Sequence, residues 1–113
     1  MVWFIEAVHE RRGLPEALLR ALRDRWAASL QLHLRARSVE IAALLAGIDE
    51  AYTTALLDDP SPKVRTAVAG FLGAATGQDG PVAERLLQAR LEVEQHRQVR
   101  AEVHLALGSL VGG

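Results

Sequence analysis

Two stretches of this sequence carry the same series of residue types at a constant separation of 35 positions. The first, LLDDPSPKVRTAVAGFLG, covers residues 56–73, and the second, LEVEQHRQVRAEVHLALG, covers residues 91–108. Each has a leucine first, then an acid, a Val-Arg pair, a further valine and finally Leu-Gly. A unit of this length that recurs along a chain is typical of proteins built by stacking helical hairpins. The repeat therefore predicts an all-α fold of packed hairpins.

The segments between the turn residues have the length and periodicity of helices. Apolar side chains recur every three or four positions, and proline, glycine and aspartate cluster at the breaks. The expected helices cover residues 2–10, 14–34, 39–57, 62–75, 81–93 and 97–110. Short connections would pair them in a single domain, residues 1–113, as three antiparallel hairpins of roughly residues 2–37, 39–76 and 79–111.

Three residues are expected at helix ends or irregularities. Ser61 precedes Pro62 and is expected to be an N-cap, because its hydroxyl can accept a backbone N–H and proline suits the first helical position. Gly77 suits the left-handed conformation that closes a helix. Gly47 is expected to kink the helix over residues 39–57.

The acid at each turn and the arginine six positions later form two predicted structural pairs, Asp59 with Arg65 and Glu94 with Arg100. Each acid lies near the positive end of the following helix, where it can accept backbone N–H groups. Each arginine can reach back to the turn acid of its own hairpin or of a neighbouring one. We expect these charges to hold hairpins together rather than to act on a substrate.

The leucine, turn aspartate, proline, Val-Arg pair and later apolar residues of the first stretch resemble the pattern of the HEAT-repeat family. In the second stretch Glu94 replaces the turn aspartate, and Gln95 stands where the first has Pro60. The pattern covers residues 55–75 and 90–110, whereas residues 1–37 fit by helix pattern without a clear Val-Arg pair. The chain is similar to small bacterial HEAT-repeat proteins of unassigned function. This resemblance implies a short right-handed α-solenoid of about three hairpins.

In that family the stacked second helices usually bind another macromolecule. The outward positions expected here are Lys63, Thr66, Gly70, Gln98, Ala101 and Leu105. The resemblance implies a non-catalytic protein–protein interaction module, a scaffold or adaptor, and plain solvated surface is the alternative for these six positions. The apolar ends, MVWFI and LGSLVGG, leave three alternatives: they tuck inward, they form a homodimer, or they continue a longer repeat array.

An arginine-rich N-terminal region gives an alternative function. Residues 1–37 hold seven arginines against four acids, whereas the whole chain has a net charge of −1. The alternative is nucleic-acid binding through Arg11, Arg12, Arg20, Arg23, Arg35 and Arg37. The near-neutral total charge makes nucleic acid the less favoured partner.

The sequence predicts no catalytic, cofactor-binding or metal-binding residues. It contains no cysteine, which excludes a disulfide scaffold, a thiolate zinc site and a cysteine nucleophile. HERR, residues 9–12, lacks the second histidine of a zinc-protease signature, and Glu92 with His96 has a spacing common on solvated helices. No apolar run approaches the ~20 residues of a membrane helix, and no secretory signal is recognisable. We therefore expect a cytoplasmic protein that is not an enzyme.

Overall fold

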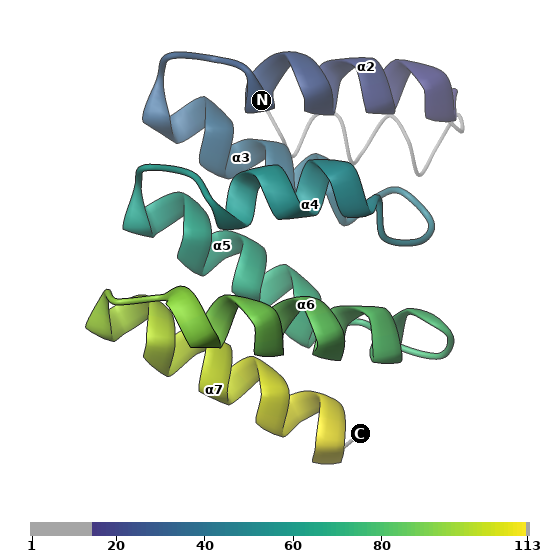
Figure 1. Ribbon diagram of the computed structural model, residues 1–113. Helices are drawn as coiled ribbons and strands as arrows, with labels where there is room; N and C mark the ends of the chain where they lie inside the picture. Colours follow the sequence, from purple (N-terminus) through teal and green to yellow (C-terminus); the bar gives the residue numbers. More distant parts are fainter. Residues whose placement is uncertain (1–14, 113) are drawn as a thin grey trace. The chain divides into compact units, whose positions relative to one another are not determined.

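The computed structural model describes residues 15–112, and the side chains of residues 15–110. Over that range the chain forms six α-helices (Figure 1). They are α2 (Glu16–Ala27), α3 (Leu32–Ala42), α4 (Glu50–Leu57), α5 (Pro62–Gly73), α6 (Asp79–Val93) and α7 (Arg97–Gly112). The all-α prediction is confirmed for this part of the chain. The helix expected over residues 2–10 lies outside it.

The chain divides into two compact units, residues 1–46 and residues 47–113. In the described part of the first unit, α2 and α3 form an antiparallel hairpin. Leu19 of α2 and Ile41 of α3 are fully buried at its centre, and the neighbouring apolar side chains pack against them. Those neighbours are Leu22, Trp26, Leu44 and Leu45.

Two predicted helices are wrong, because each contains an unpredicted turn. The helix expected over residues 14–34 ends at Ala27, and the backbone N–H of Ser29 closes onto the carbonyl of Trp26 at 3.1 Å. The helix expected over residues 39–57 is likewise divided, since residues 43–49 connect α3 to α4. Gly47 does not kink a helix. It lies in this connection with a φ of 81°, a conformation that glycine adopts at little cost.

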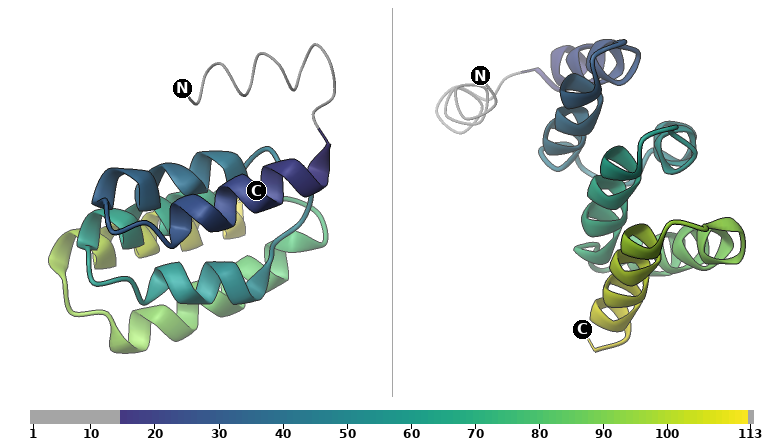
Figure 2. Two further views of the ribbon diagram at one scale, coloured as in Figure 1. Left: turned by 90° about the horizontal axis from the view of Figure 1, so that it is seen from above. Right: turned by 90° about the vertical axis from the view of Figure 1, so that its left-hand side faces the viewer.

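The second unit contains two hairpins, α4 with α5 and α6 with α7. Helices α5 and α7 pack side by side in one layer, and α4 and α6 form the other layer (Figure 2, right). Its centre is occupied by fully buried apolar side chains, which are four positions apart on α5 and on α7 and include one residue of α6. They are Val64, Val68, Leu72, Leu87, Val99 and Val103. Burying one such side chain contributes roughly 1.5–3 kcal/mol. The valines of the repeat thus have the same role in both hairpins.

Glycine at the end of α5 permits a close approach to α7. A Cβ atom on Gly73 would lie 2.8 Å from the Cβ of Ala106 and 2.9 Å from its Cα, so a side chain does not fit. The glycine of the first stretch therefore serves helix packing.

Two predicted helix ends are confirmed. The Ser61 hydroxyl accepts the N–H of Lys63 at 3.2 Å, and Gly77 has a φ of 59°. None of the helices described combines the length and apolar character needed to cross a bilayer.

Candidate functional site

The turn between α4 and α5 is held by two residues of the repeat. The Asp59 carboxylate accepts the backbone N–H of Ser61 at 2.8 Å. Arg65, one turn into α5, donates from Nη1 to the Asp59 carbonyl at 2.7 Å and to the Pro60 carbonyl at 3.2 Å. Asp59 is buried, so these bonds fix the direction in which α5 leaves the turn.

The turn between α6 and α7 has the same arrangement. The Glu94 carboxylate accepts the backbone N–H of His96 at 3.0 Å. Arg100 donates from Nη1 to the carbonyls of Glu94 and Leu91, both at 2.9 Å. In both turns the acid thus accepts the N–H two positions later, and the arginine six positions after the acid donates to the acid's own carbonyl.

A third copy of the arrangement, which sequence reasoning missed, lies between α2 and α3. The Ser29 hydroxyl accepts the backbone N–H of Gln31 at 3.0 Å, and Arg35 donates from Nη1 to the carbonyls of Ser29 and Leu30 at 3.1 and 3.2 Å. Serine replaces the acid here, and Arg35 precedes Arg65 by 30 residues rather than 35. The six-residue interval between the turn residue and the arginine was the available signal.

Glu94 is the centre of a buried ion-pair network within the second unit. Arg65 donates from Nε to Oε1 at 2.9 Å and from Nη2 to Oε2 at 3.0 Å, a bidentate pair between consecutive hairpins. Arg90 also donates from Nε to Oε1, at 2.9 Å, and from Nη1 to Asp58 at 3.2 Å. The Glu94 side chain is 1% exposed and that of Arg65 is 12% exposed. Arg65 thus joins its own turn to the acid of the next one.

This environment lowers the pKa of Glu94. Burial is the largest single influence and raises the pKa. Hydrogen bonds from Arg65, from the backbone N–H of His96 and from Arg90 together outweigh burial and lower the pKa from 4.5 to about 2. Glu94 therefore remains a carboxylate well below neutral pH, and the network keeps its charge.

The six residues predicted to face a partner lie on two adjacent helices. On α5, Lys63 and Gly70 are exposed and Thr66 is half-buried. On α7, Gln98, Ala101 and Leu105 are exposed, and Leu105 leaves 68% of its surface open. Since α5 and α7 pack side by side, these residues are available on one layer of the unit.

The arginines of the nucleic-acid alternative are placed differently from one another. Arg23 is 5% exposed, with Nε and Nη2 at 2.9 and 2.8 Å from Asp24 Oδ1, and Arg35 holds the turn described above. Arg20 pairs with Glu16 at 3.3 Å, and Arg37 is exposed. Arg11 and Arg12 lie outside the described residues. Two of the four described arginines, Arg23 and Arg35, thus form bonds within the fold.

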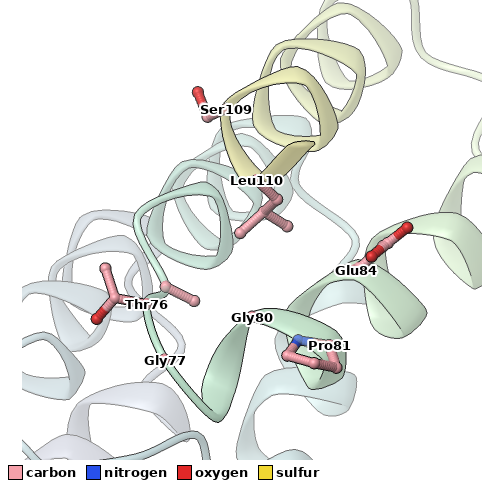
Figure 3. Close-up of a pocket in the computed structure, with 8 residues that line it drawn as sticks. Thr76, Gly77, Gly80, Pro81, Glu84, Ser109 and Leu110 are labelled. Carbon is pink, nitrogen blue, oxygen red and sulfur yellow. The ribbon is translucent and has the colours of Figure 1, made fainter. Parts of the chain in front are cut away.

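A hollow of about 400 Å³ lies where the start of α6 meets the end of α7 (Figure 3). Leu110 projects from α7 toward the start of α6, whereas the Ser109 hydroxyl is directed away from it. The lining residues are Ala75, Thr76, Gly77, Gly80, Pro81, Glu84, Ser109 and Leu110. One carboxylate and two hydroxyls among them do not form a recognisable nucleophile–base pair.

Within residues 15–112, no three histidine, aspartate or glutamate side chains gather as a metal site. Comparisons with protein-family models, with curated proteins and with solved structures find no match for this chain.

Proposed function

We propose that this protein is a non-catalytic protein–protein interaction module, a scaffold or adaptor, built as a short right-handed HEAT-like α-solenoid. The observation that carries the proposal is the side-by-side packing of α5 and α7, the second helices of consecutive hairpins. Their outward residues provide an extended surface on one layer of the unit. The turn arrangement shared by all three described hairpins supports the repeat architecture.

The partner-binding surface consists of the six residues already named on α5 and α7. Gly70, Ala101 and Leu105 offer little besides backbone and apolar atoms, and Lys63 adds one positive charge. Exposed leucine between small residues suits the apolar side of a partner helix, because small residues allow close approach. A carboxylate on that helix would complement Lys63.

Site-specific cross-linking tests the proposal. Since the chain has no cysteine, a single cysteine at Lys63 or Leu105 can carry a photoactivatable cross-linker without competing thiols. Matched controls are single cysteines at Thr54 of α4 and Gln88 of α6, which are exposed on the other layer. We expect discrete protein adducts from the α5 and α7 positions and few from the controls. Equal labelling at all four positions, or no adducts at all, would reject this surface.

The alternative function, nucleic-acid binding, is tested separately by retention of DNA or RNA. Binding driven by phosphate contacts weakens steeply as salt rises. Retention of DNA or RNA at low salt that is lost in Arg37→Ala would replace the scaffold proposal with the nucleic-acid alternative.

A further inference from the structure

A stripe of three residues on α5 receives α7. Arg65, Ala69 and Gly73 follow one another at intervals of four positions, so they lie on the same side of the helix. Arg65 pairs with Glu94, Ala69 is completely buried, and Gly73 abuts Ala106. The next hairpin therefore packs against a stripe made of one charged residue, one small residue and one glycine.

The equivalent stripe on α7 consists of Arg100, His104 and Gly108, each 35 positions later. His104 and Gly108 are exposed, and a Cβ atom on Gly108 would meet nothing within 4 Å. In Figures 1 and 2, α7 is the last helix of its unit, with α5 along one side and no described helix of that unit along the other.

Only one nitrogen of the Arg100 guanidinium, Nη1, donates hydrogen bonds to other described residues. Its Nη1 atom holds two carbonyl groups of its own hairpin, as Nη1 of Arg65 does. In Arg65, Nε and Nη2 donate to the Glu94 carboxylate. In Arg100, the same two atoms have no carboxylate partner among residues 15–112. A half-buried guanidinium with two directed donors in one plane is suited to a carboxylate.

Charge and exposure on α7 favour an acidic partner. Arg97 and Arg100 lie three positions apart on α7, and the helix contains one acid, Glu102. Leu105, beside this stripe, is mostly exposed and adds apolar surface. Arg100 repeats the arginine that α5 presents to the α6–α7 hairpin, and Arg97 adds a second positive charge beside it.

We propose that the Arg100–His104–Gly108 stripe of α7 is a docking surface for a helical hairpin of a partner protein. The turn of that hairpin presents a carboxylate to Nε and Nη2 of Arg100, and its second helix presents a small residue to Gly108. This stripe contains none of the six residues of the proposed function and borders that surface at Leu105, and it specifies the chemistry of its occupant.

The probe is a copy of the hairpin that α5 already accepts. Residues 79–113 are appended a second time, directly after Gly113. This continues the 35-residue register, because the Asp79 of the copy then lies 35 positions after the original Asp79. Amide hydrogen exchange followed by mass spectrometry reports whether the appended copy is ordered and whether α7 becomes more protected. We expect at least about tenfold slower exchange in both. Replacing the glutamate of the copy that corresponds to Glu94 by alanine should remove most of this protection.

Two substitutions in the original α7 distinguish docking through the stripe from independent folding of the copy. Gly108→Leu, which has open space in the unextended chain, should block docking and return exchange of the copy to that of an unstructured chain. His104→Ala places an alanine at the position equivalent to Ala69, so the amide protection of the copy should stay the same or increase. The control is Gln88→Ala in the original α6, an exposed position outside the stripe, which should change nothing.

The proposal is overturned if the copy exchanges as an unstructured chain, or if it is protected equally with and without Gly108→Leu. Light scattering of the unextended chain tests whether a second copy of this chain occupies the stripe instead. A dimer that Gly108→Leu dissociates would assign the stripe to a second copy of this chain and overturn the partner hairpin. Cross-linking from Lys63 belongs to α5, so its failure would reject the proposed function without affecting this result.

Discussion

The carboxylate of Glu94 is held by Arg65, 29 positions earlier, through hydrogen bonds of 2.9 and 3.0 Å. The pair joins the α4–α5 hairpin to the turn of the α6–α7 hairpin. Its geometry is planar and bidentate, which arginine provides and lysine does not. Removing one member of a buried ion pair leaves the other charge uncompensated, so such pairs are sensitive to single substitutions.

Glu94→Ala is expected to destabilise the protein by about 3–5 kcal/mol, because Arg65 and Arg90 lose their shared carboxylate. Urea unfolding followed by circular dichroism measures the change. The control is Glu50→Ala, which breaks an exposed pair with Arg85 and should cost less than about 1 kcal/mol. Equal losses in the two variants would contradict a structural role for Glu94.

The pKa of Glu94 predicts a stability loss in acid. Because the folded-state value is lowered from 4.5 to about 2, the stabilisation is complete above about pH 4.5 and disappears as the pH falls toward 2. The shift corresponds to about 3 kcal/mol. Glu94→Gln should lack this part of the pH dependence, which unfolding free energies measured at several pH values between 2 and 6 would reveal. Parallel pH profiles for the two proteins would count against the lowered pKa.

The turn residues should matter more than their exposed neighbour. Arg65→Ala removes both the Glu94 pair and the bonds to the turn carbonyls, and Asp59→Ala removes the acceptor for the Ser61 N–H. Both should lower Tm in thermal unfolding more than Lys63→Ala, whose side chain is exposed. Arg65→Lys should not restore stability, because an ammonium group cannot make the bidentate pair. A similar Tm in all four variants would remove the argument for a turn lock.

Two glycines of α5 should respond in opposite directions to alanine. Gly73→Ala places a Cβ against Ala106 and should cost about 1–3 kcal/mol through overpacking. Gly70→Ala has open space and should stabilise by up to about 1 kcal/mol through helix propensity. Chemical denaturation of the pair is the measurement, and a stabilising Gly73→Ala would show that α5 and α7 are not in close contact.

Much of the second unit could be predicted from the sequence because its signals are local. Ser61 before Pro62 specifies a helix start, and the valines at equivalent repeat positions specify the buried side of α5 and α7. The turn after Ala27 could not be predicted in this way, since residues 28–31 contain neither glycine nor proline. It is held by the Ser29 hydroxyl and by Arg35, and neither residue type interrupts a helical pattern by itself.

The sequence by itself determined the helical character of the chain, the 35-residue unit and the residue types at its turns. These follow from propensity and periodicity, which act between residues close along the chain. Only the tertiary structure decided that Arg65 grips Glu94 rather than the carboxylate of Asp59, because that choice depends on how one hairpin packs against the next. It also decided that Gly73 is covered whereas its counterpart Gly108 is open. Equivalent residues of a repeat acquire different surroundings when, among residues 15–112, one copy packs against a following hairpin and the other does not.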